Sequence, residues 1–360
     1  MANRVVLYDL SYDQLTEMLA GWGEPRYRAE QLWRWLYVSL AGDFEQMTNL
    51  PAGLRQRLAA ETDTTPLKPI SFQESANGQT RKVLFQLRDG ETIESVLMRY
   101  TDRRTACIST QVGCGMGCVF CATGQGGLAR NLSAGEIVAQ VIHLAREIKR
   151  NEFGPGDEAT LGHPVSNVVL MGMGEPLANY AATRQAIETL SDSRGYNMGA
   201  RRWTLSTVGL VPGIRRLAAE DLEINLAVSL HAPTDELRNQ IVPINRRFPL
   251  GELMAAMRDY AAKTRRRVSI EYALIDDVND RPDQAHAMAN LLEGLLCHVN
   301  LIPLNPTPGS PWQPSPRERV DAFQAVLEAA GISTTVRMRR GIDIEAGCGQ
   351  LRRRETPVQG

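Results

Sequence analysis

From Cys107 onward, short runs of aliphatic and β-branched residues alternate with segments of helical periodicity, and this alternation limits the possible folds most strongly. A strand, a helix and a second strand in succession form a parallel βαβ unit. Six such units are too few to close an eight-fold barrel. The alternation therefore predicts an α/β fold with a partial (βα)6 barrel. The expected strands are 167–173, 203–207, 224–230, 268–275, 298–304 and 334–338, and the expected helices are 133–150, 178–190, 211–220, 250–263, 283–295 and 316–330.

Two other patterns come before this alternation. Residues 11–61 have helical spacing and begin with Ser11, a residue that caps helices well, so they predict a small helical module. Residues 80–99 alternate between apolar and polar side chains around the turn Arg88-Asp89-Gly90, which predicts a β-hairpin. We therefore divide the chain into an N-terminal helical module (1–75), a β-hairpin extension of the core (76–106), the barrel (107–348, with a loop at 152–165) and a C-terminal tail (349–360).

The composition narrows the class of protein. The chain has 360 residues, 40 Lys+Arg against 41 Asp+Glu, and 43% hydrophobic residues, which indicates a globular protein and excludes a uniformly basic nucleic-acid binder. No segment approaches the roughly 18 to 20 apolar residues of a membrane span, so we expect a cytoplasmic protein without membrane contact. Nearly all the positive charge is arginine. Its clusters at 265–267, 337–340 and 352–354 fit either a solvated surface or an RNA-binding face.

Three of the six cysteines, Cys114, Cys118 and Cys121, form a Cys-x3-Cys-x2-Cys pattern on a glycine-rich loop. In a reducing compartment such a group indicates a metal, cluster or redox site rather than a disulfide. A structural zinc site uses four protein ligands, and no histidine or cysteine follows at zinc-finger spacing. Three ligands on a 4Fe-4S cluster leave one iron open for a substrate or cofactor. We therefore favour an open cluster, with zinc or buried core thiols as alternatives.

The three-cysteine loop is similar to the signature of the radical S-adenosylmethionine (SAM) superfamily. The flanking sequences resemble, in the same order along the chain, the RlmN and Cfr group of RNA methyltransferases, from about residue 94 to residue 351. The RlmN branch is favoured because it is the widespread housekeeping enzyme. The segments that carry the resemblance are Cys107-Ile-Ser-Thr-Gln-Val-Gly-Cys114, Gly172-Met-Gly-Glu-Pro176, Ser229-Leu-His231, Leu301-Ile-Pro-Leu-Asn-Pro306 and Gly347-Cys-Gly-Gln350.

The resemblance implies one [4Fe-4S] cluster held by Cys114, Cys118 and Cys121, whose open iron binds SAM and delivers the electron that generates a 5'-deoxyadenosyl radical. It also implies an external one-electron donor such as flavodoxin or ferredoxin. The residues expected to contact SAM lie at the C-terminal ends of predicted strands, where a barrel places its ligand contacts. They are Gly174, Glu175, Ser206, Ser229, Leu230, His231 and Asn305.

The resemblance also gives roles to two further cysteines and one carboxylate. The C-2 carbon of adenine is electron-poor and cannot attack a methylsulfonium directly, so a carrier is needed. By resemblance, Cys348 takes a methyl group from one SAM, and the radical from a second SAM converts it to a thiomethylene radical that adds to C-2. Glu94 then accepts the C-2 proton, and Cys107 attacks Cys348 to form a disulfide that releases the base. Without the resemblance, Cys348 reads equally as a surface thiol, Glu94 as a solvent-facing carboxylate, and Cys107, like Cys297, as a buried small residue.

The implied substrates are an adenosine of 23S rRNA and the adenosine just 3' of the tRNA anticodon, each unpaired or flipped so that C-2 is accessible. The arginines and the N-terminal module would contact the RNA backbone, and we expect a monomer. Three alternatives stay open: methylation at C-8 as in the Cfr branch, a radical SAM enzyme with a non-RNA substrate, and a non-catalytic RNA-binding protein with a structural zinc site.

Overall fold

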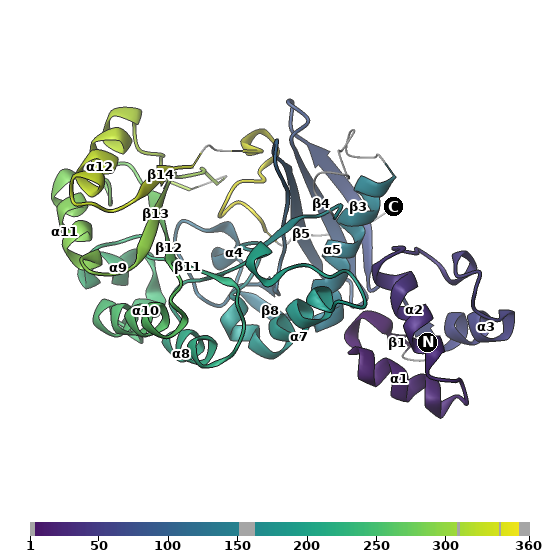
Figure 1. Ribbon diagram of the computed structural model, residues 1–360. Coiled ribbons are helices and arrows are strands. Elements are labelled where there is room, and N and C mark those ends of the chain that lie inside the picture. The colour runs from purple at the N-terminus through teal and green to yellow at the C-terminus, as the bar shows by residue number, and fades with distance from the viewer. Residues whose placement is uncertain (1–3, 151–162, 308–309, 338–339, 353–360) are drawn as a thin grey trace.

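The computed structural model describes residues 4–150, 163–307, 310–337 and 340–352 (Figure 1). Its centre is a ten-stranded sheet with the order β14-β13-β12-β11-β10-β9-β6-β5-β4-β3. The strands from β6 to β14 in this order all run parallel, and each of the six connections between them contains at least one helix. The expected α/β class and the partial (βα)6 barrel are therefore confirmed.

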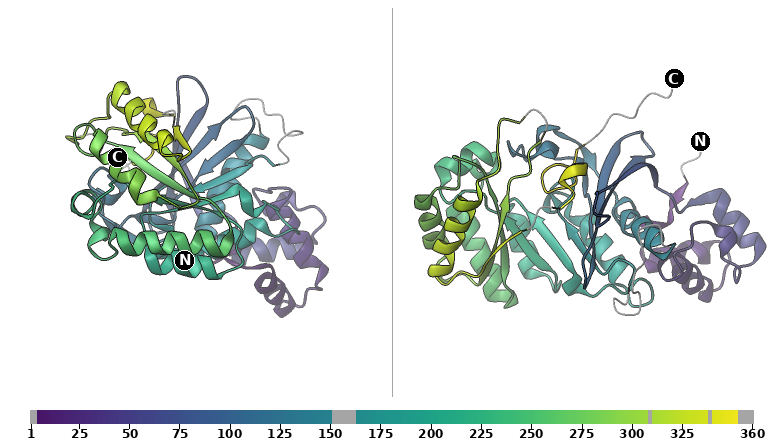
Figure 2. Two further views of the ribbon diagram at one scale, coloured as in Figure 1. Left: turned by 60° about the vertical axis from the view of Figure 1, so that its left-hand side comes forward. Right: turned by 90° about the horizontal axis from the view of Figure 1, so that it is seen from above.

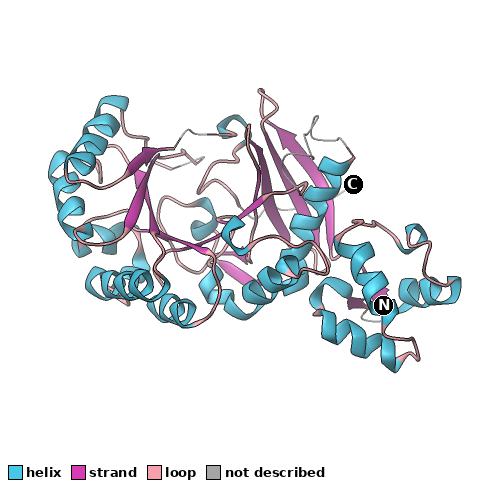
Figure 3. Ribbon diagram, viewed as in Figure 1, coloured by secondary structure: helices cyan, strands magenta, loops and turns pink. Residues whose placement is uncertain are grey.

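Each of the six expected strands and six expected helices of the barrel is present, with ends shifted by a few residues. The helices cover the outer side of the curved sheet (Figure 3). The parallel strands are β6 (Arg104–Cys107), β9 (Asn167–Leu170), β10 (Trp203–Thr207), β11 (Asn225–Ser229), β12 (Val268–Leu274), β13 (Cys297–Pro303) and β14 (Thr334–Val336). The helices are α5 (Ala134–Lys149), α7 (Tyr180–Ser191), α8 (Val211–Ala219), α9 (Asp235–Ile241), α10 (Leu250–Thr264), α11 (Pro282–Leu292) and α12 (Arg317–Ala329).

Local sequence explains both kinds of element. β12 reads Val-Ser-Ile-Glu-Tyr-Ala-Leu and is buried along almost its whole length, as expected of a parallel strand that is covered on both faces. α5 begins with a capping box, in which Ser133 Oγ accepts the Glu136 N–H and the Glu136 carboxylate accepts the Ser133 N–H. Ser11 caps α1 (Tyr12–Gly21) in the same way.

The antiparallel extension is larger than the predicted hairpin. β4 (Thr80–Leu87) and β5 (Thr92–Arg99) form that hairpin, but β3 (Leu67–Glu74) adds a further strand to it. Residues 67–74 therefore belong to the sheet and not to the helical module that the sequence assigned them to. β3 is an edge strand that contains Pro69 and exposes most of its side chains, so it lacks the alternation that identifies a half-buried strand.

The N-terminal module contains α1, α2 (Tyr27–Tyr37), α3 (Ala52–Glu61) and the short strands β1 (Val5–Val6) and β2 (Thr62–Asp63), and it packs beside α5 (Figure 1). Arg146 of α5 donates to Leu40 O and to Tyr8 Oη, both at 2.9 Å. Asp9 accepts the N–H of Gly135 at 2.5 Å, and a Cβ at Gly135 would lie only 2.7 Å from Asp9. Glycine at this position therefore lets the module dock.

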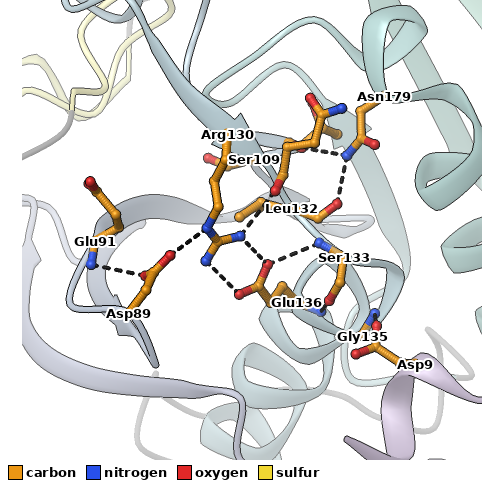
Figure 4. A network of polar contacts seen from close by, with 12 residues as sticks. Asp9, Asp89, Glu91, Ser109, Arg130, Leu132, Ser133, Gly135, Glu136 and Asn179 are labelled. Atoms are coloured by element: carbon orange, nitrogen blue, oxygen red, sulfur yellow. Dashed lines mark hydrogen bonds and ion pairs between the residues drawn. The ribbon is translucent and has the colours of Figure 1, made fainter.

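The start of α5 also anchors the turn between β4 and β5. Arg130 bridges Asp89 of that turn (2.5 Å) and Glu136 of α5 (2.8 Å), as Figure 4 shows. Arg130 belongs to β8 (Leu128–Asn131), which pairs with β7 (Gln111–Gly113). One network therefore ties the N-terminal module, the hairpin and the loop between β7 and β8 to a single helix end.

The C-terminal segment, defined as residues 340–352, crosses the open side of the partial barrel between β14 and β5 (Figure 2). Arg340 donates to Arg99 O, and the N–H of Ala76 donates to Asp343. Residues 151–162 and 353–360, which hold most of the expected loop and tail, lie outside the described residues. None of the described helices combines the length and the apolar character needed to span a membrane.

Candidate active site

The cysteine loop begins directly after β7, which follows β6 in the chain, and continues through the short helix α4 (Ala122–Gln125) to β8. The N–H of Cys114 donates to Gly127 O at 2.8 Å. Gly113 has a φ of +76°, and a Cβ there would lie 1.9 Å from Gly127 O, so glycine is required for this approach. The N–H of Ala122 donates to Gly349 O, which attaches the C-terminal segment to the same loop.

A cavity at the carboxyl ends of the parallel strands, here called the first cavity, brings most of the predicted site together. Leu230 is an exception, because its side chain is fully buried in the core while its N–H donates to Glu271 O at 3.0 Å. The predicted residues that line the first cavity are Cys114, Cys118, Cys121, Gly174, Glu175, Ser206, Ser229, His231, Asn305 and Cys348.

The three loop thiols are close enough to influence one another's ionisation. Burial raises the pKa of Cys114 to about 12. Burial, then the neighbouring Cys121 and Cys114, raises the pKa of Cys118 well above its ordinary value. Thiolates at these positions therefore need a cationic partner, which a bound metal supplies.

The described residues contain no group of three or more His, Cys, Asp or Glu side chains placed around a single metal ion. A structural zinc site places its ligands around one ion, whereas a 4Fe-4S cluster distributes its cysteine ligands over different irons.

Glu175 joins two strand ends. Its Oε1 accepts the Leu177 N–H at 3.1 Å, and its Oε2 accepts the Val208 N–H at 2.8 Å. Burial outweighs these hydrogen bonds and raises the pKa of Glu175 to about 7. The preceding Gly174 has a φ of +104°, and a Cβ there would lie 2.6 Å from the side chain of Gln111. This glycine therefore lets the loop after β9 pack against β7.

His231 and Asn305 present neutral polar groups to the first cavity. His231 Nδ1 accepts the Ala273 N–H at 3.0 Å, and burial lowers the pKa of His231 to about 3, so the ring is uncharged with its proton on Nε2. Asn305 Nδ2 donates to Cys348 O at 3.2 Å. Its Oδ1 is buried and has no hydrogen-bond partner among the described residues. That oxygen is available to accept a hydrogen bond from a ligand.

A second cavity lies beside the first, on the side of the barrel that the C-terminal segment crosses. Four arginines line it, and its described lining contains no Asp or Glu. The guanidinium carbons of Arg103 and Arg340 lie 4.0 Å and 4.3 Å from the centre of the Tyr100 ring. The residues used in the argument below are Tyr100, Arg103, Cys107, Arg202, Arg337, Arg340 and Cys348.

Cys348 lines both cavities, whereas Cys107 lines only the second. The Cys348 side chain is exposed to the cavity space, yet the protein around it raises the pKa of its thiol by desolvation, and Arg337 opposes that effect. Burial, then the nearby Cys348, raises the pKa of Cys107 to about 12. The structure therefore brings these two cysteines, 241 positions apart in the sequence, near each other.

Glu94, like Leu230, is a predicted site residue that is absent from the described lining of both cavities. It is 1% exposed, its Oε1 lies 3.3 Å from Lys82 Nζ, and its Oε2 accepts the Arg352 N–H at 3.0 Å. The C-terminal segment thus covers Glu94 in this conformation.

Comparison with known proteins identifies the family. Residues 5–63 match the ribosomal RNA large subunit methyltransferase N-terminal domain, and residues 108–289 match the radical SAM superfamily. A probable dual-specificity RNA methyltransferase RlmN from Chloroflexus aurantiacus is 56% identical over 351 residues, which cover 96% of this chain and 92% of that protein. The chain belongs to the RlmN family of radical SAM RNA methyltransferases.

Other members of the RlmN family agree with this assignment. The corresponding protein from Symbiobacterium thermophilum is 50% identical and covers 98% of this chain and 92% of its own length. The crystal structure of a radical SAM methyltransferase from Sphaerobacter thermophilus has 52% sequence identity and a TM-score of 0.92, with 97% of this chain and 99% of that chain covered. The similarity therefore includes the N-terminal module as well as the barrel.

The residues of the first cavity fit the cofactors that an RlmN-type radical SAM protein uses. The acidic side chains among its described lining residues are Glu175 and Glu271, and that lining contains no Lys or Arg. SAM carries a sulfonium and an ammonium group, so a wall with two carboxyls suits it. The unpartnered oxygen of Asn305 adds an acceptor for a donor of that ligand.

Sequence reasoning missed several residues that organise the site. Arg238 is fully buried and donates to Leu230 O (2.9 Å) and Val208 O (2.6 Å), which fixes two loops behind the first cavity. Glu271 is a charged residue inside the apolar strand β12, which was a usable signal. Lys82 is one of only four lysines, and it is 3% exposed.

Proposed function

We propose that the protein methylates the C-2 carbon of an adenosine in 23S rRNA and in tRNA, with Cys348 as the methyl carrier. The observation that carries the proposal is the position of Cys348 in the wall shared by the two cavities. A residue that takes a methyl group from one ligand and passes it to another must be accessible to both. The names of the relatives, dual-specificity RNA methyltransferases, support the two RNA substrates.

The charges of the two cavities support this division of ligands. The second cavity, with four arginines and no described acidic lining residue, suits a phosphate-bearing nucleotide. The first cavity suits a cationic ligand, as described above. We assign the cluster to Cys114, Cys118 and Cys121, and SAM to Gly174, Glu175, Ser206, Ser229 to His231, and Asn305. When bound, the cluster and SAM supply the methyl group and a carbon-centred radical, with the electron coming from a donor of the flavodoxin or ferredoxin type.

The protein's own residues complete the reaction in three proposed steps. Cys348 is methylated and then carries the one-carbon unit to the adenine ring. Glu94 accepts the proton from C-2. Cys107 attacks the sulfur of Cys348, which forms a disulfide and breaks the bond between that sulfur and the transferred carbon. The carbon keeps the electron pair of the broken bond and takes up the proton that the Cys107 thiol loses, so the ring is released with a methyl group. The proximity of Cys107 to Cys348 supports the last step.

The experiment uses anaerobically prepared protein with its iron cluster, SAM that carries a deuterated methyl group, and 23S rRNA or tRNA. We expect the label first on the Cys348 peptide and then in 2-methyladenosine, both measured by mass spectrometry. Cys107→Ala should accumulate a covalent protein–RNA adduct. Label in 8-methyladenosine would favour the C-8 alternative, and labelled RNA with an unlabelled Cys348 throughout would contradict the carrier role.

A further inference from the structure

Lys82 and Glu94 form a buried ion pair on the inner face of the antiparallel extension. Their side chains are 3% and 1% exposed, and Lys82 Nζ lies 3.3 Å from Glu94 Oε1. Lys82 on β4 is opposite Val96 on β5, and Leu84 is opposite Glu94, so the two charged residues are diagonal neighbours on one face. A buried carboxylate that lost this cation would favour its neutral form.

The same pair touches the C-terminal segment on both sides of Cys348. Lys82 Nζ donates to Glu345 O at 3.1 Å, and Glu94 Oε2 accepts the Arg352 N–H at 3.0 Å. The Arg352 guanidinium is in turn 3.1 Å from the Glu345 carboxylate. The Glu94 backbone makes two further contacts, since Ser109 Oγ donates to Glu94 O and the Glu94 N–H donates to Met173 Sδ. Lys82 thus places a cation directly against the Glu94 carboxylate.

We propose that Lys82 is the positioning residue for Glu94 in the proton-transfer step, and that it holds Glu94 as an anion until the substrate proton arrives. The inference rests on the proposed function, in which Glu94 is the acceptor. The proton moves from C-2 to the Glu94 carboxylate, the electron pair of the C–H bond stays on the adenine adduct, and Lys82 keeps its own proton. The unpaired electron that the radical addition leaves on the adduct passes to a one-electron acceptor such as an iron–sulfur cluster. Lys82 is paired with Oε1, so Oε2 is the oxygen that receives the proton. For this step Oε2 gives up its hydrogen bond from the Arg352 N–H and contacts the substrate instead.

The alternative is that Lys82 only fastens the C-terminal segment through Glu345 O. In that case a loss of Lys82 would disturb the placement of Cys348 and slow its methylation, which precedes proton transfer. The electrostatic role instead affects only steps after the adduct forms. Separate measurement of Cys348 methylation and of RNA release therefore distinguishes the two roles.

The test compares Lys82→Met, Lys82→Arg and Glu94→Gln in the full chain with its cluster. We expect Lys82→Met to methylate Cys348 at the normal rate but to release methylated RNA about 100-fold more slowly at pH 7, with accumulation of the protein–RNA adduct. The acid limb of its release rate should move up by about two pH units or more, because each unit lowers the ionised fraction at most ten-fold, and higher pH should restore part of the rate. Lys82→Arg, which keeps the charge, should retain most of the release rate.

Lys68→Met is the matched control, because Lys68 is an exposed lysine on the neighbouring strand β3, and it should behave as the unmodified protein. In the Glu94→Gln background, Lys82→Met should cause no further slowing, since there is no carboxylate left to hold; this comparison decides the question even if one variant is less stable. Release at the normal rate with an unchanged pH profile, or equal loss of Cys348 methylation and release at every pH, overturns the inference. If the unmodified protein forms neither adduct nor methylated RNA, the proposed function itself has failed.

Discussion

The first and second cavities meet at Cys348 but differ in the charge of their walls. The described lining of the first holds two carboxyls, a neutral His231 and no Lys or Arg, whereas that of the second holds four arginines and no Asp or Glu. The chain as a whole has a formal charge of -1, so this difference is local. It teaches that two ligands of opposite charge can approach one thiol from separate sides. Ligand binding in the first cavity should depend on pH, and ligand binding in the second should depend on salt concentration.

The largest effect is expected from Cys114→Ser, which removes one ligand of the proposed cluster. Iron content should fall sharply and methylated RNA should disappear, because the radical step needs the cluster. RNA affinity should stay unchanged, since Cys114 lines only the first cavity. Iron analysis and an RNA-binding titration measure the two outcomes. A parallel loss of RNA affinity would show that the cavities are not independent.

The next effect is a pH dependence of stability due to His231. Its pKa is lowered to about 3 in the folded protein, so below pH 6.5 the unfolded chain binds a proton that the folded chain does not. The contribution of His231 to the free energy of unfolding is therefore fully present above pH 6.5. It decreases as the pH falls, by about 2 kcal/mol at pH 5. Denaturant unfolding of His231→Gln should therefore show a smaller decrease between pH 7 and pH 5. Equal decreases in the stability of the variant and of the unmodified protein would show that His231 does not cause this pH dependence.

Arg103→Gln tests the second cavity. The loss of one phosphate contact should weaken RNA binding by about three- to ten-fold at low salt and reduce the slope of log affinity against log salt by about one. SAM affinity should not change, because Arg103 does not line the first cavity. Arg317→Gln is the control, since Arg317 is an exposed residue of α12 paired with Asp321. An identical salt slope for both variants would exclude Arg103 from the RNA interface.

The smallest effect is expected at the boundary between the cavities. Asn305→Ala removes the unpartnered Oδ1, and the loss of one hydrogen bond should weaken SAM binding by about five-fold, measured by calorimetry under anaerobic conditions. Asn305→Asp, which keeps an acceptor oxygen, should lose less. RNA affinity should change less than SAM affinity, because Asn305 also lines the second cavity but the four arginines there are retained. Both variants lack the Nδ2 donor to Cys348 O, so an effect of Asp as large as that of Ala or larger would contradict the acceptor role of Oδ1.

The fold was predictable where the sequence pattern reflects two-sided burial. β12 was predicted within one residue because it is buried along almost its whole length, and β10, in which buried and half-buried residues alternate, was predicted with its bounds unchanged. β3 was missed because an exposed edge strand with Pro69 has no such pattern. The paired β7 and β8 were missed as well, since three or four residues are too short to show a period.

The candidate site was predictable where a motif is local. Cys114, Cys118 and Cys121 fall within eight residues, and their spacing alone indicates a common centre. The covering of Glu94 by the C-terminal segment was not predictable, because it depends on a contact between residues 258 positions apart. The position of Cys348 in the lining of both cavities, and of Cys107 in that of the second alone, depends in the same way on how the segment crosses the barrel.

The sequence by itself determined the order of strands and helices, the three-cysteine loop and the family motifs, because each of these depends on residues close together in the chain. Only the tertiary structure decided that Cys348 stands between a carboxyl-bearing cavity and an arginine-lined one, and that Lys82 neutralises a buried Glu94. Electrostatic environment is a sum over all neighbours in space. Those neighbours come from β4, β5, β6, β12 and the C-terminal segment, and folding is what brings them together.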